Sequence, residues 1–288
     1  MLETFAFPAL GDMPLDAIQP PDVLKAMRAV EKTGKLETMH RTKARISEVF
    51  RFAIGAGRAT TDPTRDLRGL LRAKPKTRHH AALTDPAEVG QLLRAMWGYS
   101  GTPEVLAALK LSALLWQRPG EIRTMQWPQV KLDDAEPAWR YVASKTGTDH
   151  IVPLSAQAVE ILRELQPLTC RPSLPAPHYA FPGARSRLRP MSENAVNVAL
   201  RTLGYTGEQM TAHGFRATAR TLLAEQGWAP DAIERQLAHK VSGPLGAAYD
   251  RAQYLNECRK MMQAWADYLD ALRDGRKVVA GRFGRAAA

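Results

Sequence analysis

Cysteine is scarce in this sequence, which holds only Cys170 and Cys258 among its 288 residues. Two cysteines exclude a disulfide scaffold and a cysteine-rich zinc site, and they are typical of a reducing compartment. No apolar run approaches the roughly 18–20 residues that span a bilayer. The N-terminus also lacks the basic region followed by an apolar region that marks a secretory signal. We therefore expect a soluble, cytoplasmic protein.

The usual signatures of metal and nucleotide chemistry are missing as well. The sequence has no carboxylate cluster suited to Mg²⁺ and no glycine-rich loop ending in Gly-Lys-Ser or Gly-Lys-Thr that would cradle a nucleotide phosphate. It contains no internal repeat and no low-complexity tract. The length allows one large domain or two ordinary ones with a sizeable core. We expect neither a metal ion nor another cofactor.

Positive charge is present in excess. The 40 Lys and Arg residues against 29 Asp and Glu give a net charge of +11 and a pI near 9.9. Residues 41–78 carry eleven basic and three acidic residues, a net of +8, and residues 273–288 carry five basic and one acidic, a net of +4. Such concentrations indicate a polyanionic partner, in the first place nucleic acid and in the second an acidic membrane surface.

Residues 20–78 have the apolar spacing of helices. Pro20-Pro21-Asp22 is typical of a helix start, with Asp22 as the N-cap, and apolar residues then recur every three to four positions. The spacing predicts a second helix over residues 36–55, ended by Gly55-Ala56-Gly57. Its inward residues would be Met39, Ile46, Val49, Phe50 and Ala53, and its outer faces would carry Arg41, Lys43, Arg45 and Arg51.

A linker is expected at residues 75–84, where proline is mixed with charge and no apolar period is found. Beyond it the sequence predicts helices at residues 85–98, 103–116, 155–165, 192–203, 214–227, 230–238 and 255–273. Between the second and third of these, β-rich runs are expected at residues 130–133, 139–143 and 150–154. The last two flank Lys145-Thr146-Gly147-Thr148, which is typical of a hairpin turn. The expected fold class is mainly α with a small antiparallel β-sheet.

Four short stretches contain residues that could take part in catalysis. The first lies just before the β-rich part, and the second lies within it. Arg118 precedes Pro119 at a predicted helix start, where an anion can bind. An ordinary surface ion pair with Glu121 would explain the same arginine. Lys145 lies at the predicted hairpin tip, where a lysine is most often simply solvated.

The other two stretches lie in the C-terminal third. His213 and Arg216 are three residues apart on one predicted helix face, so they can converge on one phosphate. His239 is followed ten residues later by Tyr249. Together the four stretches supply two arginines, two histidines, a lysine and a tyrosine. Guanidinium groups bind phosphate oxygens at two points, and a phenol can be a covalent nucleophile, so the set suits phosphoryl transfer without a metal.

Taken in order, these stretches resemble the tyrosine recombinase family, and in particular phage, prophage and satellite-phage integrases. The motifs are Arg118-Pro119-Gly120-Glu121, Lys145, His213-Gly214-Phe215-Arg216, Leu237-Ala238-His239 and Tyr249. The resemblance continues through Phe7-Pro8-Ala9-Leu10-Gly11, through Asp62-Pro63-Thr64-Arg65-Asp66-Leu67, and through the run from Tyr254 to Leu269. It covers roughly residues 5–272.

The resemblance implies a site-specific DNA recombinase that breaks and rejoins strands through a 3′-phosphotyrosine intermediate, without metal or ATP. Arg118 and Arg216 would clamp the scissile phosphate and stabilise its transition state. His239 would donate to a non-bridging oxygen, and His213 would assist proton handling near the nucleophile. Glu121 would orient Arg118 or His213.

The same resemblance implies the roles of the lysine and the tyrosine. Lys145 would protonate the 5′-oxygen leaving group, and Tyr249 would attack the phosphorus. Tyr254 is a rival nucleophile five residues further on. Tyr249 is preferred because the family places the tyrosine nine or ten residues after the histidine that corresponds to His239.

The resemblance also divides the chain into a helical core-binding domain (residues 1–74), the linker (75–84), a catalytic domain (85–272) and a basic tail (273–288) that is expected to be disordered. The first domain would clasp double-stranded DNA opposite the catalytic domain, through phosphate contacts that position rather than specify. The residues expected to make these contacts are Arg41, Lys43, Arg45, Arg51, Lys74, Lys76 and Arg78.

Integrases of this group usually carry a further N-terminal domain that binds arm sites, and this chain starts where that domain would end. We expect a nucleoid-associated homotetramer on attachment-site DNA, with an excisionase and a DNA-bending host factor as candidate partners and no membrane partner. Two alternatives stay open. One is a DNA-binding remnant of a decayed prophage integrase without recombination activity, and the other is a type IB topoisomerase, which uses the same set of residues.

Overall fold

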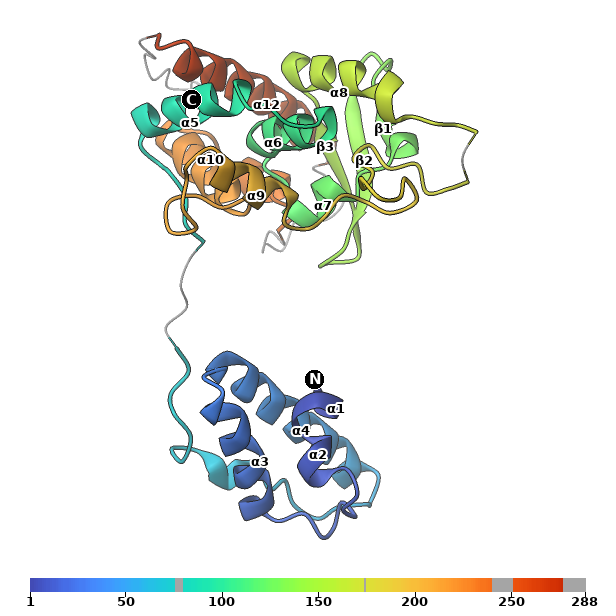
Figure 1. Ribbon diagram of the computed structural model, residues 1–288, viewed down its shortest axis with the longest axis vertical. Helices are drawn as coiled ribbons and strands as arrows, with labels where there is room; N and C mark the ends of the chain where they lie inside the picture. Colours follow the sequence, from blue (N-terminus) through green and yellow to red (C-terminus); the bar gives the residue numbers. More distant parts are fainter. Residues whose placement is uncertain (76–79, 174, 240–250, 277–288) are drawn as a thin grey trace. The chain divides into compact units, whose positions relative to one another are not determined.

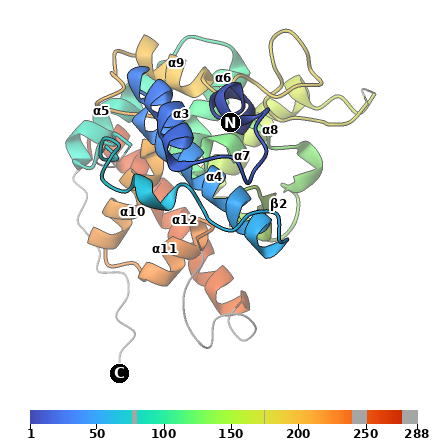
Figure 2. The same cartoon turned by 90° about the horizontal axis from the view of Figure 1, so that it is seen from below.

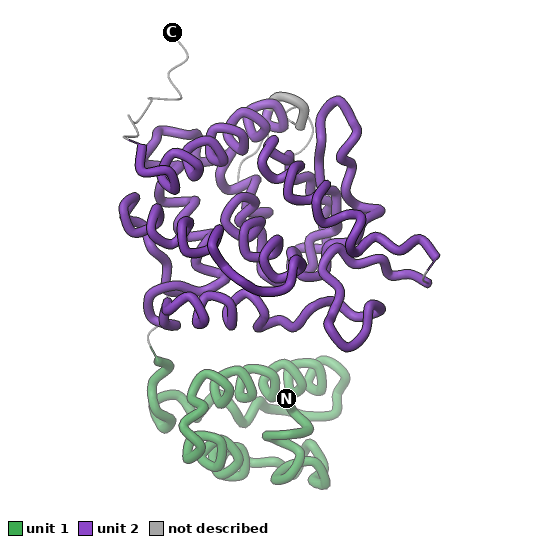
Figure 3. Tube along the Cα trace, turned by 45° about the horizontal axis from the view of Figure 1, so that its top comes forward, with its two compact units in different colours: residues 1–79 green, residues 80–288 purple. Residues whose placement is uncertain are grey.

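The computed structural model describes residues 1–75, 80–173, 175–239 and 251–276. The chain forms two compact units, residues 1–79 and residues 80–288 (Figure 3). The described part is mainly helical, with one three-stranded antiparallel sheet (Figure 1), which confirms the expected fold class. No helix among the described residues is long and apolar enough to cross a membrane.

The first unit is built from four helices and one short 3-10 turn. In order these are α1 (Leu2–Phe5), α2 (Phe7–Leu10), α3 (Pro20–Lys32), α4 (Leu36–Gly55) and η1 (Arg65–Leu67). Apolar positions at helical spacing on α3 and α4 form the core together with Leu67 of η1. The predicted helix over residues 36–55 is confirmed by the bounds of α4.

Two details of this unit differ from the prediction. Helix α3 begins at Pro20, with Gln19 as the N-cap, because proline needs no hydrogen-bond partner in the first turn. Asp22 is therefore not the N-cap; it lies inside the first turn and accepts a hydrogen bond from the backbone N of Gln19 at 3.0 Å. Val49 is 39% exposed. The buried stripe of α4 runs instead through Thr42, since only one face of the helix meets the core.

The second unit holds the remaining elements. In order these are α5 (Pro86–Trp97), α6 (Pro103–Leu115), α7 (Pro119–Arg123), η2 (Trp127–Gln129), β1 (Val130–Lys131), β2 (Ala138–Ala143), β3 (Thr148–Pro153), α8 (Ala156–Thr169), α9 (Ala195–Thr202), α10 (Gly214–Glu225), α11 (Pro230–Gln236) and α12 (Arg251–Arg273). The helices predicted for this region are present, with ends shifted by a few residues.

Helix α6 lies at the centre of the second unit (Figure 1). Between Ala107 and Leu115 every residue except Lys110 is buried. A helix that is apolar on all sides must be covered on all sides, and α6 accordingly contacts α5, α7, α8, α9, α10 and α12. This central helix ends directly before the segment that carries Arg118.

Helix α12 packs closely against α5 and also contacts α11. Figure 2 shows α10, α11 and α12 in the same part of the view. A Cβ atom added to Gly90 of α5 would lie 2.6 Å from the main-chain oxygen of Leu272. Arg94, one turn further along α5, donates Nη1 to the oxygens of Leu272 (3.2 Å) and Arg273 (3.0 Å). These are among the last carbonyls of α12, which have no donor within the helix.

The sheet has the order β1-β2-β3, and its strands are antiparallel. Its register places Tyr141 opposite His150. A short turn joins β2 to β3, and Gly147 adopts a positive φ of 66° there, which glycine takes without strain. The predicted hairpin, with Lys145 in its turn, is confirmed.

Residues 80–84, which were included in the expected linker, are attached to helix α10 and to the segment just before it. The main-chain oxygen of Ala81 accepts a hydrogen bond from the backbone N of Thr211 at 3.2 Å. The oxygen of Leu83 accepts one from Oγ1 of Thr218 at 2.6 Å. Contacts of this kind leave no periodic signal in the sequence, so the attachment of residues 80–84 could not be predicted from it.

Candidate active site

Arg216 lies at the centre of the site, in the first turn of α10, and is 5% exposed. Its Nη1 donates to the main-chain oxygen of Trp116 at 3.1 Å, and its Nη2 donates to that of Leu237 at 2.8 Å. The same Nη2 lies 3.1 Å from Nε2 of His239. Burial, together with the nearby Arg118, lowers the pKa of Arg216 to about 10. The guanidinium therefore keeps its charge at neutral pH.

Two residues with strained backbone present their carbonyls to the arginines. Trp116 (φ 42°) and Ala238 (φ 51°) are the non-glycine residues with positive φ among those described. This conformation costs roughly 1–2 kcal/mol for a residue with a β-carbon. The oxygen of Trp116 accepts from Arg216, and that of Ala238 accepts from Nη2 of Arg118 at 3.4 Å. Backbone strain of this kind is concentrated at functional sites.

Arg118 reaches the same region from the start of α7, where it is the N-cap residue before Pro119. It is half-buried. Its Nη1 atom is buried and has no hydrogen-bond partner in the part of the chain that the structure describes. A buried N–H without a partner costs about 1–3 kcal/mol. This donor is therefore free to bind an anion.

His239 is held by a carboxylate on one side and by an arginine on the other. Its Nδ1 lies 2.6 Å from Oε2 of Glu234, and its Nε2 faces Nη2 of Arg216. Because a guanidinium can only donate, these partners assign a neutral ring with its proton on Nδ1. Burial alone would raise the pKa of Glu234, but hydrogen bonds from His239 and Arg220 lower it overall. The His239 side chain is 43% exposed and can meet a ligand.

His213 lies at the N-terminal boundary of α10, before Gly214. Its ring centroid lies 4.2 Å from that of His80, at an interplanar angle of 35°. Burial, together with the charges of His80 and Arg216, lowers the pKa of His213 to about 4. The ring is therefore neutral at physiological pH. His80 was expected in the linker, and no pattern in the sequence indicates its contact with His213.

Lys145 is exposed in the β2–β3 turn, and its charge is among those that lower the pKa of His213. The preceding residue, Ser144, donates from its backbone N (2.9 Å) and its Oγ (2.7 Å) to Oε1 of Glu121. We expected Glu121 to orient Arg118 or His213, but its hydrogen bonds in the described structure go to the hairpin. Spacing along α7 places Glu121 near Arg118 but does not reveal which other element faces its carboxylate.

The two candidate nucleophiles are Tyr249 and Tyr254. Tyr249 lies outside the described residues, so its assignment stays a prediction. Tyr254 is described: its ring lies over Arg235, with 3.9 Å between the ring centroid and Cζ. It also lines a cavity of about 790 Å³ together with His239.

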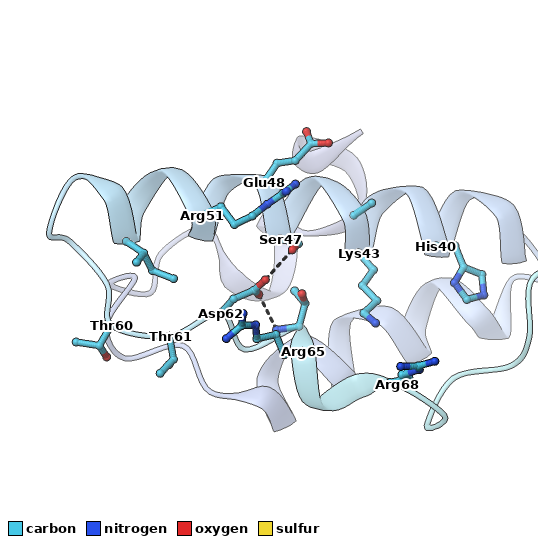
Figure 4. Close-up of a pocket in the computed structure, with 13 residues that line it drawn as sticks. His40, Lys43, Ser47, Glu48, Arg51, Thr60, Thr61, Asp62, Arg65 and Arg68 are labelled. Carbon is cyan, nitrogen blue, oxygen red and sulfur yellow. Dashed lines mark hydrogen bonds between the residues drawn. The ribbon is translucent and has the colours of Figure 1, made fainter.

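A second candidate site lies on the first unit, in a cavity of about 810 Å³ between α4 and residues 60–68 (Figure 4). We call it the basic cavity. Its cationic lining residues are Lys43, Arg51, Arg65 and Arg68. Asp62 fixes the wall opposite α4, because it accepts hydrogen bonds from Oγ of Ser47 (2.6 Å) and the backbone N of Thr64 (2.9 Å).

The expected DNA-contacting residues of this unit fall into three groups. Lys43 and Arg51 line the basic cavity. The structure gives three others a carboxylate partner: Arg41 and Lys74 pair with Glu37, at 3.0 and 3.2 Å, and Arg45 pairs with Glu48 at 2.5 Å. The remaining two, Lys76 and Arg78, lie outside the described residues. Two lining arginines, Arg65 and Arg68, were not singled out, although they lie in and next to the Asp-Pro-Thr-Arg motif.

The main site is suited to a phosphodiester. Two fixed guanidinium groups converge in it, with His239 beside Arg216, and guanidinium groups bind the oxygens of phosphate. Within the described ranges, no group of three or more His, Cys, Asp and Glu residues is placed to hold a metal ion. The two guanidinium groups can stabilise negative charge on the oxygens of a phosphate.

This fold and this set of groups define the class of tyrosine-type site-specific DNA recombinases. The model of the phage integrase central domain matches residues 1–70, and that of the phage integrase family matches residues 82–254. The chain belongs to the phage integrase family.

Two relatives illustrate the relationship. The chain is 33% identical over 270 residues to the integrase of Shigella phage Sf6, covering 94% of this chain and 68% of that protein. It is 34% identical over 290 residues to the integrase of Enterobacteria phage P4, covering 95% of this chain and 64% of that protein. The chain thus spans about two thirds of the length of these relatives.

Solved structures share the fold at lower identity. A lambda integrase dimer bound to a COC′ core site has a TM-score of 0.60 at 21% identity, covering 84% of this chain and 86% of that one. The Tn1549 transposon integrase in complex with transposon right-end DNA has a TM-score of 0.60 at 16% identity, covering 86% and 83%. At these identities the likeness concerns the fold.

Proposed function

We propose that this chain cuts and rejoins double-stranded DNA at attachment sites, through a transient covalent bond between Tyr249 and a 3′-phosphate. One observation carries the proposal: Arg118 and Arg216 are held by main-chain carbonyls at one place, and a buried N–H of Arg118 has no partner among the described residues. A phosphodiester supplies the missing acceptor.

The first step is an attack on phosphorus. The Oη atom of Tyr249 forms a bond to phosphorus, and its proton passes to the neutral ring of His213. The bond from phosphorus to the 5′-oxygen breaks at the same time. Arg118 and Arg216 stabilise the charge that develops on the non-bridging oxygens. The bound phosphate also offsets the cationic field that lowers the pKa of His213, so this ring becomes a better base once DNA is in place.

The leaving 5′-oxygen takes a proton from Lys145 and becomes a hydroxyl. Glu121 supports this step indirectly, because it holds Ser144 at the base of the turn that carries the lysine. Rejoining is the reverse: a 5′-hydroxyl attacks the phosphotyrosine, and the protons return to Lys145 and Tyr249. The energy of the phosphodiester is kept in the phosphotyrosine, so no external energy source is consumed.

The DNA complex is proposed to be a homotetramer. Lambda integrase, which shares this fold, is described as a dimer on a core site and as a tetramer on a Holliday junction. The net charge of +11 favours DNA as the partner. An excisionase and a DNA-bending host factor are proposed as direction-controlling partners, and the nucleoid is proposed as the place of action.

The proposal is tested with nicked suicide duplexes made from the DNA that flanks the gene. In these substrates the short strand diffuses away after cleavage and traps the covalent intermediate. We expect a protein–DNA adduct that survives denaturing electrophoresis. Tyr249→Phe should abolish the adduct, and Tyr254→Phe should retain it.

Each other outcome points to a different conclusion. Adduct in Tyr249→Phe but not in Tyr254→Phe would move the nucleophile to Tyr254. Specific binding of the duplexes without any adduct would support the inactive remnant. Relaxation of plasmids that lack the flanking DNA would support a type IB topoisomerase.

A further inference from the structure

The end of helix α11 is a shared hydrogen-bond acceptor for the active site. The last carbonyls of any helix lack donors within it, and α11 ends at Gln236. The oxygen of Leu237 accepts from Arg216 at 2.8 Å, and that of Ala238 accepts from Arg118 at 3.4 Å. The main-chain path through these residues thus sets the position of both arginines.

The main-chain oxygen of Gln236 is held in turn by the buried side chain of Gln117. Nε2 of Gln117 donates to this oxygen at 2.7 Å and to the oxygen of Leu115 at 3.2 Å. Gln117 is 1% exposed, and its Oε1 accepts a hydrogen bond from the hydroxyl of Tyr141 at 3.0 Å. Because both ends of its amide have partners, the side chain is fixed in one orientation.

His150 of strand β3 approaches the same oxygen. Its Nε2 lies 3.2 Å from the oxygen of Gln236, and since a carbonyl only accepts, the proton of the ring is on Nε2. Tyr141 lies edge-on against this ring, with 5.4 Å between the centroids. Burial lowers the pKa of His150 to about 4, so the neutral ring is the form present at neutral pH.

We propose that Gln117 and His150 are positioning residues of the recombination reaction. They fix the end of α11 from two directions, the α6–α7 junction and strand β3, and thereby place Arg118, Arg216 and the adjoining His239. The proposal rests on the proposed function, because it concerns the same site. Misplacing reacting groups by about 1 Å can cost on the order of 100-fold in rate, so the contacts matter although neither residue acts on the phosphate.

Three substitutions separate the hydrogen bonds from the volume of the side chains. Gln117→Glu keeps the acceptor for Tyr141 but replaces the donor to Gln236 with an oxygen. His150→Leu removes the second donor, whereas His150→Gln supplies an amide N–H in its place. Gln166→Leu, which changes an exposed glutamine of α8, is the matched control.

The measurement is single-turnover cleavage of the nicked suicide duplex at saturating protein, alongside the Kd for the same duplex. We expect the cleavage rate constant to fall about 10- to 100-fold in Gln117→Glu and His150→Leu, with Kd changed by less than about threefold. His150→Gln should recover most of the rate. All six tryptophans lie in the second unit, so tryptophan fluorescence verifies that each variant is folded at the assay temperature.

Cleavage within about threefold of the wild-type rate in both Gln117→Glu and His150→Leu would overturn the proposal. So would a rate loss fully explained by unfolded protein. A rate in His150→Gln as low as in His150→Leu would remove His150 from it.

A second readout needs neither DNA nor catalysis. In the ¹⁵N-histidine-labelled chain, imidazole nitrogen spectra should place the proton on Nε2 of His150 and on Nδ1 of His239. Gln117→Glu should shift the His239 resonances, and Gln166→Leu should not. If the wild-type chain forms no adduct but the spectra behave this way, the proposed function fails, and only the placement of His239 through Gln117 stands. If the adduct forms and Gln117→Glu changes neither cleavage nor spectra, the positioning role alone fails.

Discussion

Arg118 and Arg216 illustrate how main-chain oxygens can prepare a phosphate site before the phosphate arrives. Each guanidinium is anchored by the carbonyl of a residue with positive φ, Ala238 for the first and Trp116 for the second. Because the fold already fixes these side chains, less conformational entropy is lost when DNA binds. Donors preorganised in this way are a major source of transition-state stabilisation in enzymes.

The residue types of the site could be predicted from the sequence, but their partners could not. Arg118, Arg216 and His239 each stand in a recognisable motif. The carbonyl that anchors Arg216 belongs to Trp116, which is 100 residues away in the chain, and any residue type supplies a carbonyl. The ring contact of His80 with His213 likewise arises from tertiary folding and has no local signature.

His150 leads to a prediction about stability and pH. Burial and the charges of Arg118 and Arg216 lower its pKa, the hydrogen bond to Gln236 opposes them, and the net pKa is about 4. In the unfolded chain a histidine titrates near 6.5. The folded pKa is the lower one, so the stabilising contribution is complete above about pH 6.5 and is lost as the pH falls toward 4.

We therefore expect the loss of unfolding free energy between pH 7 and pH 5 to be about 2 kcal/mol smaller in His150→Gln than in the wild type. Urea unfolding followed by tryptophan fluorescence at both pH values measures it. Equal losses in the two proteins would contradict a strongly lowered pKa.

Among the elements, the β2–β3 hairpin depends on another element for its position. The turn itself is local, and its Gly and polar residues predicted it correctly. Its attachment to α7 through Ser144 and Glu121 is not local. Short-range turn chemistry therefore gives the shape of this hairpin, and a buried carboxylate elsewhere in the chain sets where its lysine lies.

Glu121→Ala should slow cleavage about 10- to 100-fold, because Lys145 is then no longer held near the leaving oxygen. The defect should largely disappear on a duplex with sulfur at the 5′-bridging position, since a thiolate leaves without a proton. Glu193→Ala, which changes an exposed glutamate, is the control. An equal defect on both duplexes would mean that Glu121 does not act through the lysine.

The contact between α5 and α12 makes a prediction about stability. In Gly90→Ala the new Cβ would lie 2.6 Å from the oxygen of Leu272, so one of the two helices must shift. We expect the unfolding free energy of the second unit to fall by about 1–3 kcal/mol. In the control Gly98→Ala the nearest atom is 3.6 Å away, and a change within about 0.5 kcal/mol is expected. Similar urea midpoints for the two variants would contradict this description of the contact.

Strongly periodic elements were predictable, and segments held by main-chain contacts were not. Helix α4 follows the predicted span because its apolar positions repeat over five turns. Residues 80–84 carry no such pattern, yet the oxygens of Ala81 and Leu83 bind Thr211 and Thr218. Side-chain burial leaves a periodic pattern in the sequence. Main-chain hydrogen bonds between residues far apart in the chain leave none.

At the scale of the whole molecule, the excess of positive charge in a segment does not show which of its cations are placed to bind DNA. Residues 41–78 hold eight units of the net positive charge, but several of their cations face carboxylates. The basic cavity gathers Arg65 and Arg68 with Lys43 and Arg51 (Figure 4). We therefore expect these four side chains to contribute most of the phosphate contacts of the first unit.

Arg65→Ala and Arg68→Ala should each weaken binding to duplexes of any sequence. Each should also reduce the slope of log K against log salt concentration by about 1, because one fewer phosphate is neutralised. Arg28→Ala, which changes an exposed arginine of α3 away from the basic cavity, serves as control. Slopes that change equally in all three variants would show that the charge acts diffusely rather than through the cavity.

The central claim is that this site forms a covalent 3′-phosphotyrosine at Tyr249, and mass spectrometry of the trapped adduct tests it most directly. Trypsin cleaves after Lys240 and Arg251, so residues 241–251 carry Tyr249 and residues 252–259 carry Tyr254. After nuclease trimming, we expect a nucleotide joined through its 3′-phosphate to the peptide 241–251. A nucleotide on peptide 252–259, a 5′-phosphate linkage, or no modified peptide at all would contradict it.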